Sequence, residues 1–264
     1  MLYSEAMKTI LKKTILISLI ITLNNSIVLA NDTNTDDNSY KPNMESVAYN
    51  EQGVAVINKD PEKAAKLFQK ALSIDNKNIS ALLNYATLKI SEKKGNEVTG
   101  ILDAYRNSYP KISDIHYLLG DIYFADKQID KALDSYKKVL VLKPGTNGLF
   151  AKLGNIYLLK KELSNAEFMY EQAYKNKPKD TSILNNYANI LLANHKVQDS
   201  LRILKESLNI QDTPEGNFTL ATIYEIQKDI PSAVEYYKKA RALGSKQEGL
   251  DKKIEELSNS VESF

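Results

Sequence analysis

Two histidines and scattered carboxylates are the side chains of this chain that could carry acid–base or metal chemistry. His116 and His195 are the only histidines. A metal site or a base–nucleophile pair needs partners at set spacing, and neither histidine has such a partner nearby in the sequence. We therefore expect His116 to pack in a core and His195 to lie in a solvated turn.

The other sequence signals of catalysis are also missing. The chain has no cysteine, which excludes disulfides, thiolate metal sites and a cysteine nucleophile. Paired carboxylates, as in "KIEEL" at 253–257, follow the pattern of solvated helix faces, and no glycine-rich phosphate loop or G-x-S-x-G motif occurs. We expect a protein that is not an enzyme and has no catalytic residues, metal or cofactor.

The charge balance argues against nucleic acid as a partner. Removing residues 1–30 takes three lysines and one glutamate from the 35 basic and 33 acidic residues, so the remaining chain has a net charge of about zero. A phosphate-binding protein normally carries a basic surplus or stripe. With no tryptophan, few glycines and prolines, and many Leu, Ala and Lys residues, the composition instead favours helices joined by short turns.

The N-terminus has the order of a secretory signal peptide. Three lysines precede the apolar run "TILISLIITL" at 14–23. The segment "SIVLA" then ends at Ala30, with Val28 two positions before it. We expect cleavage after Ala30, export to the periplasm, and no membrane span afterwards. The uncleaved alternative is an anchor, but the run is shorter than the ~20 residues of a spanning helix. Met7 begins a more typical signal than Met1, so the translation start is left open.

Residues 31–43, "NDTNTDDNSYKPN", are polar and acidic, and we expect a disordered linker there. From Met44 onward the pattern becomes helical and repeats. Aligned at a period of 34, residues 113–146 and 147–180 place Leu-Gly, Tyr, Ala, Tyr and Pro in the same slots. The shared slots hold Leu119, Gly120, Tyr123, Ala132, Tyr136 and Pro144 in one copy, and Leu153, Gly154, Tyr157, Ala166, Tyr170 and Pro178 in the next.

This pattern resembles the tetratricopeptide repeat (TPR) family. Six copies fill residues 44–247, at about 46–78, 79–112, 113–146, 147–180, 181–213 and 214–247. The resemblance implies an all-α fold: a TPR α-solenoid, which is a right-handed superhelix of helix–turn–helix hairpins. Small residues such as Gly120 and Gly154 would let the helices of a hairpin approach, and the tyrosines would fill the space between hairpins.

The last stretch, 248–264, is predicted to be a C-terminal capping helix. Apolar residues recur on one face at helical spacing, with Lys and Glu on the other face. They are Leu250, Ile254, Leu257 and Val261. A membrane-surface helix is the alternative, but the mixed charges lack the basic bias of such helices.

In the TPR family the first helices of the hairpins line a concave groove, and the resemblance implies a peptide-binding site there. The candidate residues are mostly amides and aromatics: Asn50, Asn84, Tyr117, Asp121, Phe124, Asn155, Asn186, Asn189 and Phe218. Amide side chains can donate to and accept from an extended peptide backbone, and aromatic rings can hold apolar side chains. The alternative is that Asn84, Asn155, Asn186 and Asn189 only reflect family ancestry, because Asn is common at their positions in TPR repeats.

The resemblance also excludes one ligand class. TPR domains that dock cytosolic heat-shock chaperones hold a C-terminal carboxylate with three cations and two asparagines. The corresponding positions here are Ala151, Asn155, Asn186, Glu215 and Thr219, so the amides are present and the cations are missing. Because acidic groups also line the groove, we expect a neutral or mildly basic segment to bind.

We therefore expect an exported, non-catalytic scaffold that binds a protein or peptide partner along its concave face. One alternative is a pilus or outer-membrane assembly factor, although the pilus factors with this architecture are lipoproteins and this chain has no cysteine to lipidate. Another is the accessory platform of a cell-envelope enzyme. A homo-oligomer joined through terminal repeats is left open. We also expect Asn155→Glu with Asn186→Glu to abolish binding and leave melting nearly unchanged.

Overall fold

The computed structural model describes residues 40–262, with side chains to residue 260, and this part of the chain is all helical. The predicted signal peptide, 1–30, and residues 31–39 of the predicted linker lie outside the described residues. The thirteen described helices are α2 (Met44–Val56), α3 (Pro61–Ile74), α4 (Ile79–Ser91), α5 (Asn96–Ser108), α6 (Ser113–Ala125), α7 (Ile129–Leu142), α8 (Leu149–Leu159), α9 (Leu163–Asn176), α10 (Thr181–Ala193), α11 (Val197–Ile210), α12 (Pro214–Ile226), α13 (Ile230–Ala242) and α14 (Leu250–Glu262). The all-α prediction is confirmed.

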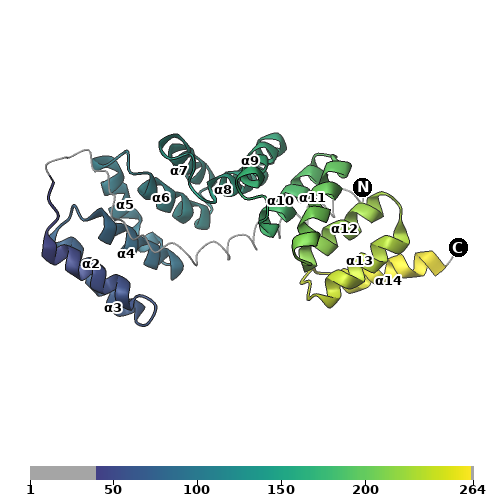
Figure 1. Cartoon of the computed structure of the whole chain (residues 1–264), viewed down its shortest axis with the longest axis horizontal. Helices are drawn as coiled ribbons and strands as arrows, with labels where there is room; N and C mark the ends of the chain where they lie inside the picture. Colours follow the sequence, from purple (N-terminus) through teal and green to yellow (C-terminus); the bar gives the residue numbers. More distant parts are fainter. Residues whose placement is uncertain (1–39, 263–264) are drawn as a thin grey trace. The chain divides into compact units, whose positions relative to one another are not determined.

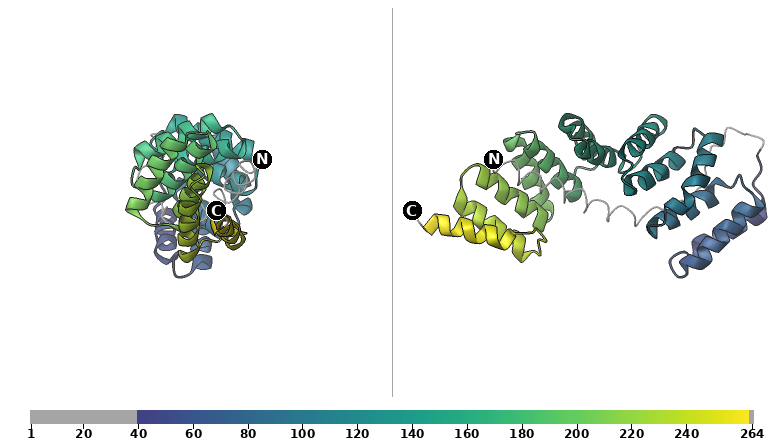
Figure 2. Two further views of the ribbon diagram at one scale, coloured as in Figure 1. Left: turned by 90° about the vertical axis from the view of Figure 1, so that its right-hand side faces the viewer. Right: turned by 180° about the vertical axis from the view of Figure 1, so that it is seen from behind.

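Consecutive helices pair into hairpins, as Figures 1 and 2 show from several sides. The chain divides into two compact units, which meet in sequence at Leu149 and Phe150. The N-terminal unit holds the hairpins α2–α3, α4–α5 and α6–α7, and the C-terminal unit holds α8–α9, α10–α11, α12–α13 and the single helix α14. Within each unit, the second helix of a hairpin packs on the first helix of the next, as α3 does on α4 and α9 does on α10.

A glycine on the first helix lies under an aromatic ring of the second helix in several hairpins. A Cβ built on Gly120 would lie 2.5 Å from Cε1 of Tyr136, and one built on Gly53 would lie 2.5 Å from Cε1 of Phe68. Gly154 meets the ring of Tyr170 in the same way. Each of these contacts is closer than a methyl group allows, so the ring fills the volume that a side chain would occupy. Glycine thereby sets the close approach of the two helices.

Five of the six hairpin turns, all except the α2–α3 turn, share one unusual backbone conformation. One residue in each of the five has a positive φ between 60° and 64°: Lys93, Lys127, Lys161, His195 and Lys228. Two amides of each of these turns bond back to the first helix, as Lys161 N does to Leu158 O and Glu162 N does to Tyr157 O. This is the left-handed C-terminal cap that satisfies the last carbonyls of a helix. His195 is exposed in its turn, as the sequence predicted.

His116 packs in the interior, as predicted from its place in the repeat. Its side chain is 7% exposed, and Nε2 lies 2.9 Å from the carbonyl oxygen of Pro110. Burial lowers the pKa of His116 despite this hydrogen bond, and the charges of Arg106 and Lys138 lower it further. His116 is therefore a neutral core residue near pH 7.

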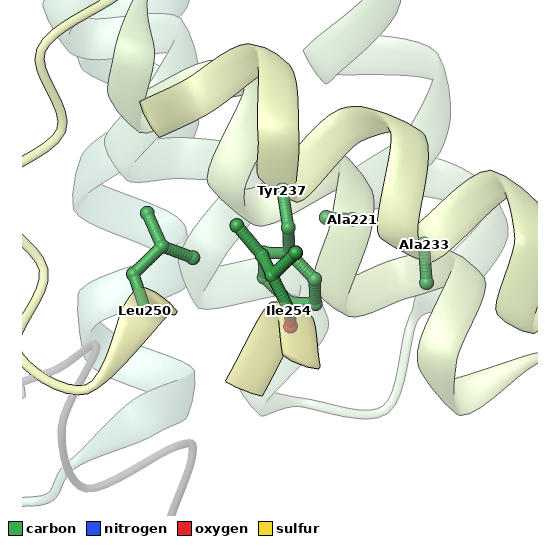
Figure 3. Packing of buried hydrophobic residues seen from close by; sticks show 5 residues of the cluster. All are labelled: Ala221, Ala233, Tyr237, Leu250 and Ile254. Atoms are coloured by element: carbon green, nitrogen blue, oxygen red, sulfur yellow. The ribbon is translucent and has the colours of Figure 1, made fainter. Parts of the chain in front are cut away.

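The last helix covers the end of the C-terminal unit. Leu250 and Ile254 of α14 are each 5% exposed and pack with Tyr237 of α13 and with Ala221 and Ala233 (Figure 3). Leu257 adds to the same cluster, while the side chain of Val261 lies outside the described residues. The apolar face predicted for a capping helix is thus the face that packs on the preceding hairpin.

Candidate peptide-binding groove

The two amides predicted for the start of the groove bond to each other. Asn84 Nδ2 of α4 donates to Asn50 Oδ1 of α2 at 3.0 Å, across one repeat. Asn84 is only 3% exposed, whereas Asn50 is half-buried. This pair links two neighbouring first helices, so it helps to fix their spacing.

Further along the N-terminal unit, α6 contributes an acidic and aromatic face. Tyr117, Asp121 and Phe124 are all half-buried and lie three to four residues apart along the helix. The hydroxyl of Tyr136 donates to Asp121, and the ring of Tyr117 meets Tyr136 edge-on at 5.8 Å. Burial raises the pKa of Tyr136, and the carboxylate of Asp121 raises it further, so the hydroxyl stays protonated and holds Asp121 in place.

In the C-terminal unit, the amides of two consecutive repeats meet at one buried tyrosine. Tyr170 is fully buried, and its hydroxyl donates to Asn155 Oδ1 at 2.6 Å. Burial raises the pKa of Tyr170, and a hydrogen bond with Asn186 opposes this rise. Both predicted groove amides therefore serve the core. Our expectation that charge reversal at Asn155 and Asn186 leaves melting unchanged is revised, because Asn155 is 8% exposed and a longer, charged side chain there would be buried beside the Tyr170 hydroxyl.

The remaining predicted residues lie on α10 and α12. Asn189 Oδ1 accepts a 2.9 Å hydrogen bond from Thr219 Oγ1 of the next repeat. Phe218 is half-buried, and its ring packs edge-on against Tyr237 at 5.2 Å. Polar side chains of neighbouring first helices are again joined across repeats, here by a hydroxyl and an amide, and part of the Phe218 ring remains accessible.

Sequence reasoning did not single out Lys253 of α14, which lines a pocket together with the predicted residue Phe218. Its ammonium lies 2.9 Å from Glu225 Oε2 and 5.5 Å from the centre of the Tyr237 ring. The same Glu225 oxygen accepts from the Tyr237 hydroxyl at 2.7 Å, and Thr222 Oγ1 lies 3.1 Å from that hydroxyl. The sequence carries no clear signal for this contact, because the last helix lacks the Leu-Gly and Tyr residues of the repeats.

The residues described here give no support for metal chemistry or a membrane span. Between residues 40 and 262, no three histidine or acidic side chains gather closely enough to hold a metal ion. Nor is any helix in that range both long and apolar enough to cross a bilayer.

Comparison with known proteins identifies the repeats. Tetratricopeptide repeat profiles match residues 55–122, 113–146 and 149–180. The chain contains tetratricopeptide repeats. No curated protein sequence matches the chain significantly.

Solved TPR structures share the fold. PilF from Pseudomonas aeruginosa matches with a TM-score of 0.65 and 17% identity, over 76% of this chain and 94% of that one. YrrB, described as a TPR protein with an unusual peptide-binding site, matches with a TM-score of 0.63 and 16% identity, over 76% of this chain and 100% of that one. A TPR protein from Parabacteroides merdae gives 0.55 and 16%, over 80% and 83%. At these identities the likeness concerns the fold.

The spacing of the repeat explains why some first-helix side chains already bond within the protein and are less available to a ligand than others. The tyrosine of the second helix bonds to the residue fifteen positions earlier in three hairpins: Tyr136 to Asp121, Tyr170 to Asn155 and Tyr237 to Thr222. In the first hairpin Phe68 replaces that tyrosine, and the apolar Val54, fourteen positions earlier, packs on the same cluster. In these hairpins the first-helix residue is polar where the buried ring carries a hydroxyl and apolar where it does not.

Proposed function

We propose that this TPR protein is an exported scaffold or adaptor that binds an extended segment of a partner protein along the first-helix face of its hairpins. TPR proteins are typically non-catalytic, and the arrangement of the groove supports binding. The observation that carries the proposal is the α6 face, where two half-buried aromatic rings, Tyr117 and Phe124, flank the carboxylate of Asp121. Such a face can hold apolar and polar parts of a peptide together.

Rigid support of this face favours binding. Asp121 is held by the buried Tyr136, whose hydroxyl donates to it, and Tyr117 packs edge-on against the same ring. Side chains that are already fixed lose little conformational entropy when a ligand binds. The N-terminal unit would therefore present a preorganised surface to a flexible segment.

The charge of the first helices supports a neutral or mildly basic ligand. Glu45, Glu51, Asp114, Asp121, Glu215 and Glu225 lie on first helices, against only two lysines, Lys89 and Lys152. Lysines or arginines of the partner segment would complement this surplus, and added salt would weaken the association.

The experiment that tests this function compares two phenylalanines. Phe124 lies on the first helix α6, whereas Phe168 lies on the second helix α9 and is 55% exposed. A photo-crosslinking amino acid placed at either position in cells should yield a specific partner from position 124 only. The partner segment should carry net positive charge, and Phe124→Glu should reduce its affinity at least about tenfold while Phe168→Glu does not.

The same experiment can contradict the proposal. Equal crosslinking from both positions would mean non-specific contact, and crosslinking from position 168 alone would place the binding site on the second helices. Melting curves of Phe124→Glu and Phe168→Glu provide the stability control, since both changes replace an accessible ring by a carboxylate.

The export part of the proposal rests on the N-terminal sequence. The three lysines before the apolar run, the run itself, and Ala30 with Val28 two positions before it support periplasmic localisation. N-terminal sequencing of the protein from fractionated cells should begin at residue 31. A chain that keeps its N-terminus and stays in the cytosolic fraction would contradict export without affecting the groove.

A role in pilus or outer-membrane assembly, or as the platform of an envelope enzyme, remains an alternative for the same binding face. The fold likeness to PilF supports only a similar architecture. Crosslinked partners would separate these roles, because an assembly role requires a membrane or pilus component at position 124.

A further inference from the structure

The surface under α14 has the geometry of a receptor for an amphipathic helix. Leu250, Ile254 and Leu257 follow one another at spacings of four and three residues and pack as one apolar face on the cluster that includes Tyr237 of α13 and Ala221 of α12. Figure 3 shows Leu250 and Ile254 of this face with Tyr237. This is the way an amphipathic helix occupies a hydrophobic groove. α14 occupies the place that the first helix of a further repeat would take, because it packs mainly on the preceding second helix, α13.

The contacts that hold α14 are few. Beyond the apolar face, they include the Lys253–Glu225 pair at 2.9 Å and the Arg241–Asp251 pair at 3.1 Å. The Asp251 side chain is 80% exposed, so its ion pair contributes little. The first helices inside the solenoid are held from two sides by their own second helix and the preceding one. α14 is the last described helix and is held mainly from one side.

One side chain shows that α14 fits this surface imperfectly. Ser258 lies four residues after Ile254, on the packed side of the helix, and its buried Oγ has no hydrogen-bond partner. A buried hydroxyl without a partner destabilises the docked state, whereas an aliphatic side chain at the same place would add to the apolar contact. A helix with leucine at this position would therefore bind the surface better than α14 does.

The segment that connects α13 to α14 allows α14 to detach from the surface of α13. Residues 243–249 join the two helices, and Gly244 and Gly249 have φ values of +87° and +72°. A Cβ at either glycine would meet no atom within 4 Å, so the segment is not packed around them. Glycine gives this segment a wide range of conformations when α14 detaches.

From these observations we infer that α14 is a displaceable occupant, and that the Tyr237 surface binds an amphipathic helix of a partner protein in its place. The partner helix has Leu or Ile at positions i, i+4 and i+7, a Lys at i+3 to meet Glu225, and an aliphatic residue at i+8 where α14 has Ser258. This second binding site goes beyond the peptide groove proposed above. Because docked α14 competes for the surface, the apparent affinity for the partner helix is its intrinsic affinity multiplied by the fraction of time that the surface is uncovered.

The test uses a synthetic helix and the full chain. The probe is a fluorescein-labelled peptide of residues 248–262 that carries Ser258→Leu, and the control peptide also carries Leu250→Asp and Ile254→Asp. The probe should bind and the control should not. The chain variant Ile254→Ala, which weakens the docked α14, should bind the probe at least about fivefold tighter than the unaltered chain. The chain variant Ser258→Leu, which strengthens α14, should bind it at least about fivefold more weakly.

Hydrogen exchange locates the event. With saturating probe, the amides of α14 should exchange faster while those of α12 and α13 keep their protection. Equal probe affinity for the unaltered chain and for Ser258→Leu, or unchanged exchange of α14 in the bound state, would overturn the inference. A stable dimer without peptide, seen by light scattering and abolished by Ile254→Asp, would also overturn it, because the occupant would then be α14 of a second copy.

Discussion

The hydroxyl of the buried Tyr170 donates a 2.6 Å hydrogen bond to Asn155, which lies fifteen residues earlier on the first helix of the same hairpin. The same spacing joins Tyr136 to Asp121, and Tyr237 to Thr222. A polar residue on the groove side of the first helix therefore satisfies a tyrosine that the hairpin needs for packing. This link couples groove chemistry to stability, and mutations in the groove must be read with it in mind.

The first prediction concerns this bond. Asn155→Ala leaves the Tyr170 hydroxyl buried with one partner fewer, and should lower the free energy of unfolding by about 1–3 kcal/mol. Tyr170→Phe removes the hydroxyl itself and should cost less, and adding Asn155→Ala to it should cost little more. Urea unfolding followed by circular dichroism, combined as a double-mutant cycle, measures the coupling. Additive effects of the two changes would show that the bond does not matter in solution.

The second prediction concerns the glycine under the same ring. A Cβ on Gly154 would overlap the ring of Tyr170, so Gly154→Ala should destabilise the protein by about 1–3 kcal/mol. Gly100 on α5 is the matched control, because it is exposed and a Cβ there meets no atom within 4 Å. Gly100→Ala should stabilise the protein by about 0.5–1 kcal/mol, since alanine favours a helix interior. Thermal unfolding of both variants checks the opposite signs.

The repeats could be predicted from the sequence because their packing rules are local and recur. Gly120 and Gly154 occupy the same position of the repeat, and Tyr136 and Tyr170 occupy another. In the structure the ring of Tyr136 lies over Gly120, and the ring of Tyr170 lies over Gly154. Sequence alone could place the groove residues on the first helices. It could not show that Asn155 already accepts a hydrogen bond from Tyr170, because this contact depends on the direction of the two side chains across the hairpin.

The position of Lys253 could not be predicted from the sequence pattern either. It lies in a helix that follows the last repeat and lacks the repeat's Leu-Gly and Tyr slots, so no register placed it near Glu225. Its contact depends on how α14 packs on α13, which is a tertiary relationship. Asn84 and Asn50 were both predicted to face a ligand, yet they bond to each other, because two first helices pack closer than their positions in sequence reveal.

The third prediction concerns the turn residue with a left-handed backbone. Lys161 has a φ of 61°, a conformation that costs an L-residue with a side chain about 1–2 kcal/mol. Lys161→Gly should therefore stabilise the protein, by about 1 kcal/mol after the larger entropy of glycine in the unfolded chain is counted. Lys161→Ala keeps the Cβ and should give no such gain. A melting temperature that rises equally in both variants would mean that removal of the lysine charge is the cause.

The last prediction concerns acid. Burial lowers the pKa of His116 in the folded state, with Arg106 of α5 and Lys138 of α7 adding to the effect, while its unfolded pKa is about 6.5. The unfolded chain then binds more protons than the folded one below that pH. The stability that depends on neutral His116 is therefore complete above pH ~6.5 and is lost as the pH falls through the folded pKa. Urea unfolding at pH 7.5 and 5.5 should show a smaller loss of stability for His116→Phe than for the unaltered chain. The exposed His195 is the matched control, and His195→Gln should keep the full pH dependence. If His116→Phe and His195→Gln lose the same free energy of unfolding between pH 7.5 and 5.5, the carboxylates, and not His116, cause the loss of stability in acid.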